Sequence, residues 1–233
     1  MRRGKKYLEK EKLVVRDKLH SPVEAVSLLK DLAFANFDES IEAHFNLGID
    51  PRQSDQQIRG TLVLPHGTGK VVKILVIASG DKLSEATDAG ADYVGSDDMI
   101  EKIQGGWFDF DLVLTTPDMM AKVGRLGKTL GTKGMMPNPK SGTVTVNIAD
   151  AVREFKAGKV EYKNDKSGVV HVMIGKKSFL NQKLLENFYA VYDTLQKVKP
   201  PKAKGIYLKT LFLCCTMSKG ISIEPLKIKW KEV

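Results

Sequence analysis

The triplet Gly127-Lys128-Thr129 has the residue types that end a phosphate-binding P-loop. A complete P-loop has a glycine, four residues and then Gly-Lys-Ser/Thr, and it lies between a strand and a helix. Lys122 occupies the position of the leading glycine, and the segment before it is predicted to be helical rather than extended. The pair Gly69-Lys70 also fails, because Val71 follows it. Neither stretch predicts a nucleotide site.

Other catalytic motifs are equally incomplete. Asp109 and Asp111 have the Asp-x-Asp spacing of some phosphotransferases, but the preceding "GGWF" cannot be the buried strand that such a motif terminates. Two aspartates that cap the start of a strand explain the spacing better. Cys214 and Cys215 are adjacent, so they point to opposite faces of a strand and make poor disulfide partners. The four histidines are far apart in sequence. We therefore expect no catalytic residues, no metal site, no cofactor and no enzyme activity.

One segment is rich in cations and free of acids. Residues 119–149 contain no Asp or Glu, whereas residues 71–118 carry 3 Lys/Arg against 10 Asp/Glu. Interspersed glycines let a backbone approach a phosphate closely, and prolines restrict the freedom of a loop. The stretch "RLGKTLGTKGMMPNPKSGTV" (125–144) is thus interpreted as an irregular loop suited to sugar–phosphate contact. The alternative is a connector whose lysines are only solvated. The cations of residues 119–144 are Lys122, Arg125, Lys128, Lys133 and Lys140.

The elements at the two ends of the chain favour an antiparallel sheet. Ser21, Pro22 and Glu24 form the start signal of a helix, with Val23, Val26, Leu29 and Ala33 on one face. Residues 37–50 alternate as a half-buried strand, with Phe37 on its apolar side, and a strand from Ile58 is expected to pair with it. Residues 159–175 suggest a hairpin around "NDKSG". A helix over residues 181–198 and a long strand over residues 206–217 follow.

The middle of the chain has a different pattern. The apolar run "VVKILVIASG" is typical of a strand buried on both faces, and it is followed by alternating helical and extended segments up to a short strand at 142–147 and a helix closed by Gly158. Such alternation predicts parallel βαβ units. The economical interpretation is a domain inserted into a discontinuous outer domain, with two chain crossings near 66–70 and 157–160.

Charge divides the chain in the same way. The flanking segments 1–70 and 159–233 together carry 27 Lys/Arg against 16 Asp/Glu, whereas residues 71–158 carry 10 against 12. The net charge of +9 indicates a polyanionic partner, which we expect to bind mainly to the outer domain. No apolar run approaches the ~20 residues of a membrane span, and the charged N-terminus does not resemble a secretory signal. We expect a soluble intracellular protein without membrane contact.

Several long segments resemble the bacterial-type ribosomal protein L-one family. They include "FDESIEAHFNLGIDPRQSDQQIRGTLVLPHGTGK", "GADYVGSDDMIEKIQGGWFDFD", "TPDMMAKVGRLGKTLGTKGMMPNPKSGTV" and "FKAGKVEYKNDKSG", and the resemblance extends from about residue 3 to residue 223. It implies an α/β and α+β protein of two domains: an antiparallel-sheet outer domain built from both chain ends (1–68 and 159–233) and an inserted Rossmann-like, three-layer α/β domain (69–158).

The resemblance also implies function. Proteins of this family bind large-subunit rRNA at the mobile stalk and contact exit-site tRNA as it leaves, and many bacterial members repress translation of their own mRNA. The protein would be monomeric when free and cytoplasmic on the ribosome, or in an organelle with bacterial-type ribosomes. The implied rRNA-binding residues are Phe37, Ser40, Glu42, Lys163, Asp165, Lys166, Thr210, Thr216 and Met217. A secondary contact with rRNA or tRNA would use Arg52, Arg125, Lys128, Lys133 and Lys140.

The chain departs from the family pattern at four places. The usual Thr-Met-Gly-Pro is Thr216-Met217-Ser218-Lys219, the usual Leu-Gly-Pro ends in Thr132, and Asn36 stands where lysine is frequent. Loss of a glycine beside RNA removes a permissive backbone position, while Lys219 adds a charge that could offset it. We expect RNA binding to survive with lower affinity, and repression of the chain's own mRNA is the function most in doubt. Without the resemblance, Phe37 would be assigned to the core, because in the alternating pattern it falls on the same side as Ile41 and Ala43.

Overall fold

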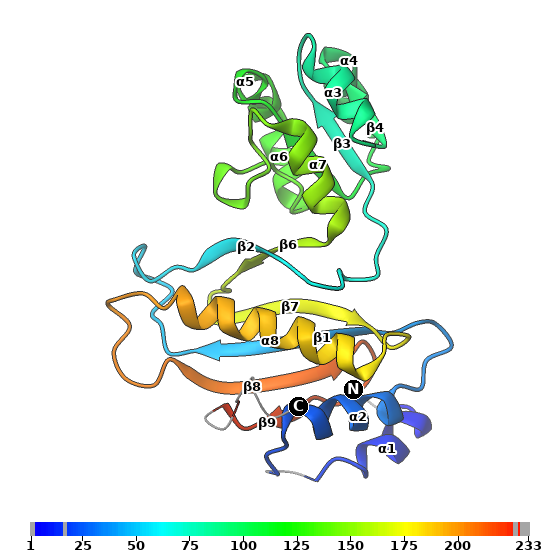
Figure 1. The fold of residues 1–233 in the computed structure, drawn as a ribbon, viewed down its shortest axis with the longest axis vertical. Coiled ribbons are helices and arrows are strands. Elements are labelled where there is room, and N and C mark those ends of the chain that lie inside the picture. Colours follow the sequence, from blue (N-terminus) through cyan, green and yellow to red (C-terminus); the bar gives the residue numbers. More distant parts are fainter. Residues whose placement is uncertain (1–2, 16–17, 226–227, 229–233) are drawn as a thin grey trace. The chain divides into compact units, whose positions relative to one another are not determined.

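The alternating residues 40–47 form the central strand of a sheet in the computed structural model, which describes residues 3–15, 18–225 and 228. This strand, β1 (Ser40–Leu47), buries Ile41, Ala43, Phe45 and Leu47 and leaves the residues between them partly exposed, as period-two alternation predicts. It pairs antiparallel with strands that come much later in the chain (Figure 1). The sheet order is β7-β1-β8-β9, with β7 (Val169–Lys176), β8 (Leu208–Cys215) and β9 (Ile221–Ile223).

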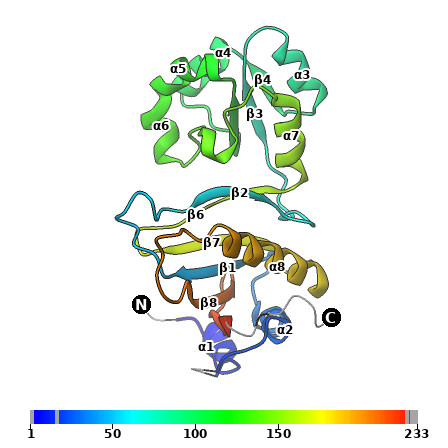
Figure 2. The ribbon, with the colours of Figure 1, turned by 60° about the vertical axis from the view of Figure 1, so that its left-hand side comes forward.

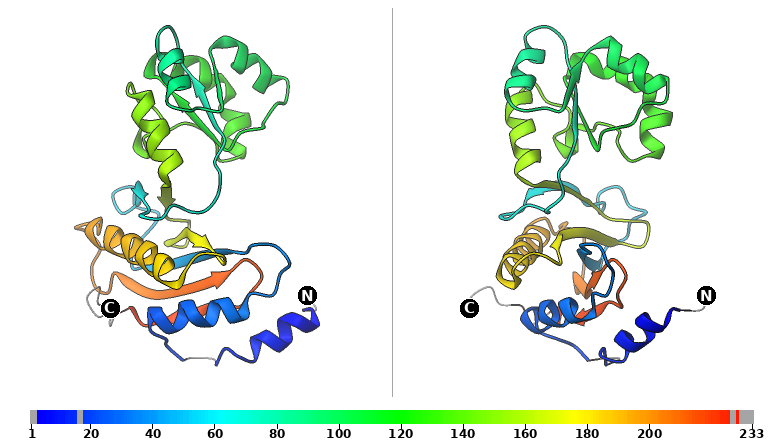
Figure 3. Two further views of the ribbon diagram at one scale, coloured as in Figure 1. Left: turned by 45° about the vertical axis from the view of Figure 1, so that its right-hand side comes forward. Right: turned by 90° about the vertical axis from the view of Figure 1, so that its right-hand side faces the viewer.

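Two helices cover the apolar face of this sheet (Figure 3). Helix α2 (Pro22–Leu32) begins with the predicted capping box, in which Ser21 Oγ accepts from Glu24 N and Glu24 Oε2 accepts from Ser21 N, both at 3.3 Å. The residues on its buried face are Pro22, Ala25, Val26, Leu29 and Leu32. The assignment of Val23 to this face was wrong, and Val23 is exposed. The stripe of the helix that packs on the sheet is rotated by about one residue from the predicted stripe. Helix α8 (Asn181–Lys197) buries Phe188 against Phe45.

Neither strand pairing predicted for the outer segments is correct. Strand β2 (Arg59–Val63) pairs with β6 (Lys159–Lys163) in a separate two-stranded sheet, not with β1. Of the hairpin expected over residues 159–175, only the turn is present. In this turn Asp165 N donates to Val169 O at 2.8 Å, and a single bridge joins Asn164 to Val170. Beyond the turn β6 and β7 separate into different sheets. Helix α1 (Lys5–Glu11) and strand β9 were not predicted.

The middle of the chain forms a three-layer α/β unit, as predicted (Figure 2). Its parallel sheet has the order β4-β3-β5, and every residue of the central strand β3 (Ile74–Ile77) is buried. The flanking strands are β4 (Tyr93–Gly95) and β5 (Leu112–Thr115). One face packs against α3 (Lys82–Asp88) and α7 (Ile148–Ala157), which Gly158 closes in the left-handed conformation at φ 110°. The other face packs against α4 (Asp97–Gln104) and the helical turns described next.

The segment interpreted as an irregular loop is mostly helical. The turns η1 (Pro117–Met119), α5 (Met120–Val123), η2 (Gly124–Leu126) and α6 (Gly127–Thr132) follow one another, and η3 (Pro139–Ser141) comes later. They form because Met119, Val123, Leu126 and Leu130 recur at helical spacing and are buried on the sheet. The short strand expected at 142–147 is a single parallel bridge between Thr115 and Val144, where Thr115 N donates to Thr143 O and Thr145 N donates to Thr115 O.

The chain divides into two compact units. The outer unit is Met1–Gly69 with Tyr162–Val233, and the inserted unit is Lys70–Glu161. The expected boundaries, at 68/69 and 158/159, lie one and three residues from these. Within the described ranges, no helix combines the length and the apolar composition that a bilayer crossing needs.

Asp109 should stabilise the inserted unit in a pH-dependent way. Its carboxylate accepts from Lys73 Nζ at 2.5 Å and from Tyr93 OH at 2.8 Å, and these bonds lower the pKa of Asp109. A depressed carboxyl pKa gives stability that is present above the unfolded pKa of 3.8 and is lost as the pH falls through the folded pKa. In urea unfolding, Asp109→Asn should be less stable than the parent at pH 6 and equal to it near pH 2.

Because these groups are exposed, the difference should be small and weaken with salt. The control is Asp118→Asn, at an exposed aspartate after the next strand, whose effect on stability at pH 6 should be smaller than that of Asp109→Asn. A deficit of Asp109→Asn that persists at pH 2 would show that the aspartate acts by packing rather than by charge.

Candidate nucleic-acid interface

The polar side of the four-stranded sheet carries three of the nine predicted rRNA-binding residues, Ser40, Glu42 and Thr210, and the other six lie in segments that precede or follow its strands. Alternation along each strand puts one set of side chains on the side opposite to α2 and α8, and all of them are exposed or partly exposed. We call this set the open face. It consists of Ser40, Glu42, His44 and Asn46 of β1, Thr210, Phe212 and Cys214 of β8, and His171 and Met173 of β7.

One end of the open face is fastened by a network around Thr216. Thr216 Oγ1 accepts from Ser40 N at 3.0 Å, and Thr216 N donates to Ser40 O at 3.1 Å, so the chain after β8 stays bonded to the start of β1. Beneath it lies Glu39, which is fully buried and accepts from Met217 N at 3.1 Å and from Ala35 N at 2.8 Å. The predicted residues Ser40, Thr216 and Met217 are therefore brought together, with Thr216 in a positioning role.

Apolar side chains are exposed at the same end. Phe37 is 54% exposed and Met217 49% exposed, and Phe212 lies on the open face itself at 38%. The parity argument for burying Phe37 was wrong, because β1 begins only at Ser40 and the alternation does not extend back to Phe37. Asp38, next to it, accepts from Ser178 N and Ser178 Oγ, which holds the segment before the strand in place. Exposed aromatic and thioether groups beside hydroxyls suit contact with nucleic acid.

The departures from the family signature are accommodated locally. Ser218 Oγ accepts from Cys215 N at 2.9 Å, so the hydroxyl stabilises the turn in which the family usually has glycine. Lys219 Nζ lies 3.4 Å from Glu11 Oε1 of α1, so its charge is partly neutralised by that carboxylate rather than left for a ligand. Thr132 Oγ1 donates to Thr129 O at the end of α6, a bond that proline cannot make. Asn36 is exposed.

The remaining predicted residues of the outer unit lie towards the other end of β1. Thr210 is exposed and stands opposite Asn46 in the register, about 20 Å along the strand from Ser40. Asp165 closes the turn before β7, where its Oδ1 accepts from Ser167 N and Val169 N, both at 2.8 Å. Lys163 and Lys166 flank this turn and are exposed, as is Arg52 in the loop after β1.

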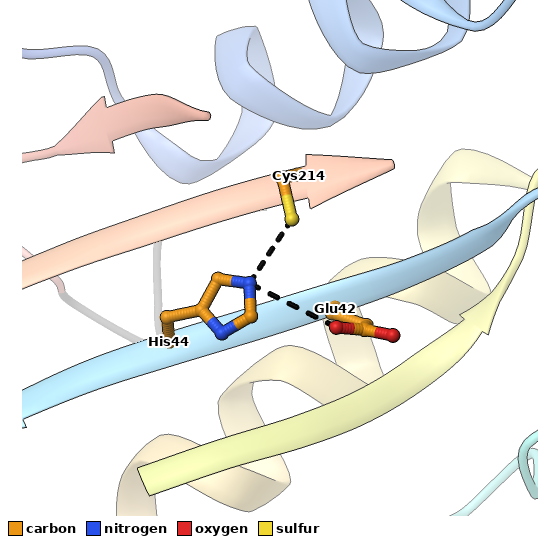
Figure 4. Close-up of side chains that lie close together, drawn as sticks. All are labelled: Glu42, His44 and Cys214. Carbon is orange, nitrogen blue, oxygen red and sulfur yellow. Dashed lines mark hydrogen bonds and ion pairs between the residues drawn. The ribbon is translucent and has the colours of Figure 1, made fainter. Parts of the chain in front are cut away.

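A cluster of titratable side chains occupies the middle of the open face, and sequence reasoning missed it. His44 Nε2 lies 3.0 Å from Cys214 Sγ and 3.9 Å from Glu42 Oε2 (Figure 4). On its other side, His44 Nδ1 lies 2.7 Å from His171 Nδ1. Burial, followed by the neighbouring His171, lowers the pKa of His44. Burial, reinforced by Glu42, raises the pKa of Cys214 to about 11.

No metal site was expected because the histidines are far apart in sequence, and that reason no longer applies: the donor atoms of Glu42, His44 and Cys214 all lie within 4.8 Å of one another. Only the pairing of β1 with β7 and β8 reveals this proximity. The alternation of polar residues along β1 is the one signal in the sequence that put Glu42 and His44 on a common face.

The predicted secondary contacts of the inserted unit lie on helical turns. Arg125, Lys128, Lys133 and Lys140 are all exposed. Lys133 Nζ lies 4.1 Å from the centre of the Phe108 ring, a cation–π contact that fixes its position. The glycine N–H groups expected to face a phosphate are not all free: Gly134 N donates to Gly131 O and Gly142 N donates to Pro139 O. Contact of this segment with RNA stays a prediction, and such a contact would be made mainly by the side chains of its cations.

The chain was compared with models of protein families. The model of the ribosomal protein L1p/L10e family matches residues 29–219, which extend from the last turn of α2 to the turn after β8. The match thus includes the open face, the Thr216–Met217 turn and the whole inserted unit. It covers far more than half of the chain and agrees with the resemblance of the long sequence segments. This protein belongs to the ribosomal protein L1p/L10e family.

Proposed function

We propose that this chain binds rRNA at the stalk of the large ribosomal subunit, and that the open face and the adjacent Thr216–Met217 turn form the contact. The observation that carries the proposal is the hydrogen bonding at one end of the open face. There the backbone and hydroxyl of Thr216 are bonded to the backbone of Ser40, next to the exposed Phe37 and Met217. A rigid surface loses less entropy on binding than a mobile one. The role is non-catalytic.

The chemistry of this surface suits an RNA helix or a structured junction. RNA exposes 2′-hydroxyls and phosphates in a wide minor groove, where Ser40 and the backbone of the Thr216–Met217 turn can exchange hydrogen bonds with them. Phe37 and Met217 exclude water from such bonds and thereby strengthen them. Glu42, 44% exposed, can accept from a 2′-hydroxyl but repels a phosphate. The surface therefore favours sugar contacts near its centre and phosphate contacts at its rim.

Two finer functions complete the proposal. The exposed cations Arg125, Lys128, Lys133 and Lys140 of the inserted unit, and Arg52 of the outer unit, are proposed to contact exit-site tRNA or neighbouring rRNA. The same open face would bind a similar structure in the chain's own mRNA and repress its translation. Support for repression is weaker, because the pairing of Lys219 with Glu11 leaves less charge for a ligand beside the signature turn.

Filter binding with an RNA of the stalk tests the proposal. Affinity should fall steeply with salt, by a slope of about 0.7–0.9 per phosphate neutralised. Binding that ignores salt, or no binding at all, contradicts the proposal. A nucleotide thermal-shift screen should show no stabilisation, whereas stabilisation by ATP or NAD would favour a small-molecule enzyme instead. Co-sedimentation with large subunits separates a ribosomal component from an RNA-binding regulator that acts away from the ribosome.

The double variant Thr216→Val, Met217→Ala should weaken stalk-RNA binding by about tenfold, or 1.4 kcal/mol, because it removes both the fastening hydroxyl and an apolar contact. Lys128→Ala, on the inserted unit, should weaken it by less than about threefold, the effect of one peripheral charge. Leu180→Ala is the control, since Leu180 is 67% exposed at the start of α8 and lies outside the open face. If Lys128→Ala has the larger effect, the main contact lies on the inserted unit instead.

A further inference from the structure

Three potential metal ligands meet on the open face because of strand register. Glu42 stands directly opposite Cys214 in the pairing of β1 with β8, and His44 is two residues further along β1 on the same side. In an antiparallel pair, direct and diagonal neighbours on one face are within reach of one another. The imidazole of His44 lies between the thiol and the carboxylate, with Nε2 towards both (Figure 4). The backbone of a rigid sheet thus presents one nitrogen, one sulfur and one oxygen donor.

Two of the three distances among these donors are close to what a tetrahedral zinc ion requires, and the third, from Cys214 Sγ to the Glu42 carboxylate, is within 4.8 Å. With Zn–S near 2.3 Å and Zn–N or Zn–O near 2.0 Å, tetrahedral angles need about 3.5 Å between sulfur and nitrogen and about 3.3 Å between nitrogen and oxygen. The observed separations are 3.0 Å from His44 Nε2 to Cys214 Sγ and 3.9 Å from His44 Nε2 to Glu42 Oε2. Each differs from its ideal by roughly half an ångström, which small rotations of the side chains supply.

A second set of residues orients the histidine for this role. Asp165 Oδ2 lies 3.6 Å from His171 Nε2 and favours a proton on that nitrogen. His171 Nδ1 is then an acceptor, and because it lies 2.7 Å from His44 Nδ1, the proton between them belongs to His44. His44 Nε2 is left with a free lone pair directed towards Cys214 and Glu42. A metal-binding imidazole usually donates its other N–H to an acceptor that fixes its orientation, and here His171 is that acceptor, with Asp165 behind it.

We propose that Glu42, His44 and Cys214 bind a Zn²⁺ ion in the open face, with the fourth coordination position directed outwards. All three side chains are partly exposed, so an ion can enter from solvent. Binding converts the Cys214 thiol into a thiolate and releases one proton to solvent. The site changes from a net charge of −1, carried by Glu42, to zero, since the carboxylate and the thiolate balance the ion.

This change has a consequence for RNA that depends on the function proposed above. Glu42 is the acidic group in the middle of the surface proposed to contact rRNA, and an unpaired carboxylate there repels phosphates. A bound Zn²⁺ ion removes that repulsion and offers its open position to a phosphate or hydroxyl oxygen. Zinc occupancy should therefore strengthen RNA binding.

Titration of the free protein with Co²⁺ tests the metal site without RNA. One Co²⁺ per chain should bind, with a thiolate-to-metal charge-transfer band that Zn²⁺ abolishes by displacement. Cys214→Ser should remove the band, and His44→Ala should weaken affinity by at least tenfold. Cys215→Ser is the matched control: its thiol is buried on the opposite side of β8, 3.5 Å from Leu29 O, and the variant should bind Co²⁺ like the parent. Circular dichroism verifies that each variant is folded.

A variant behind the ligands tests the orienting chain. His171→Ala should weaken Co²⁺ affinity by about tenfold while retaining the charge-transfer band, because it removes the support of His44 but no ligand. His66→Ala, in which the lost imidazole is paired with Glu186 elsewhere in the outer unit, should have no effect. The proposal is overturned if the parent gives no charge-transfer band, if Cys214→Ser keeps it, or if Cys215→Ser loses it equally.

RNA titrations with and without Zn²⁺ separate this proposal from the proposed function. If stalk RNA binds but the protein takes up no metal, only the zinc site fails. If the metal binds but stalk RNA does not, only the RNA-binding function fails. An increase in RNA affinity with Zn²⁺ for the parent and for Cys215→Ser, absent in Cys214→Ser, is the result expected from both together.

Discussion

Replacing Glu39 by glutamine should destabilise the outer unit by about 1–3 kcal/mol, because one of the two partly buried backbone N–H groups that donate to its carboxylate loses its acceptor and meets a second donor. Glu39 is fully buried, and its two carboxyl oxygens accept separately from Ala35 N and from Met217 N. Glutamine has the same shape but only one oxygen. Urea unfolding followed by circular dichroism measures the difference.

The control for this prediction is Glu42→Gln, three residues along the chain. Glu42 is 44% exposed, so the same chemical change should alter stability by less than about 0.5 kcal/mol. Stalk-RNA binding by Glu39→Gln should fall even at temperatures where the variant is folded, because the Met217 turn loses its anchor. Parent-like stability would mean that the two N–H groups find other acceptors and that Glu39 does not hold this edge.

Asn187→Leu should cost about 3–5 kcal/mol, since three backbone groups, one in a buried and two in partly buried hydrogen bonds, lose their partner. Asn187 lies on the inner side of α8 and is fully buried. Its Nδ2 donates to Gly67 O at 2.9 Å and to Ile174 O at 2.8 Å, and its Oδ1 accepts from His66 N at 3.1 Å. One amide thus joins helix α8, strand β7 and the end of the first outer segment. Leucine fills the space but makes none of these bonds.

Asn181→Leu is the matched substitution at the exposed start of the same helix, where the side chain makes one long bond of 3.4 Å to Ser27 Oγ. It should change the free energy of unfolding by less than about 0.5 kcal/mol. Thermal and urea unfolding of the two variants should differ accordingly. Equal effects of the two substitutions would show that the loss of stability comes from placing leucine in this helix rather than from removing the buried amide of Asn187.

The inserted unit could be predicted almost entirely from the sequence because its signals are local. A parallel sheet covered on both sides needs a continuous apolar strand, and Ile74–Ile77 is one; each crossover helix then follows its strand directly. The exception is the cationic segment, where glycines suggested a loop. Leu126 and Leu130 were present at helical spacing, and their burial on the sheet outweighed the low helix propensity of Gly127 and Gly131.

The outer unit was harder because its pairings are not local. Alternation along β1 identifies which side chains are buried but does not identify the neighbouring strand, so Arg59–Val63 was assigned to β1 although it pairs with β6. The His44–Cys214 and His44–His171 contacts span 170 and 127 residues of sequence, and no motif at fixed spacing can reveal them. Glu39 precedes β1 at a position with the same parity as the buried Ile41 and Ala43, and it is buried as well although its side chain is ionisable.

The pairing of β1 with late strands also determines when the protein can fold during synthesis. Strand β1 ends at Leu47, and its first partner, β7, begins at Val169. At about 5–20 residues per second, the ribosome needs roughly 6–24 s to supply that partner. During this interval both edges of β1 lack their native neighbours, while all three parallel strands of the inserted unit, β3 to β5, have already been made. The nascent chain therefore carries an unpaired amphipathic strand that a chaperone could protect, and deletion of the inserted unit should shorten the period of exposure.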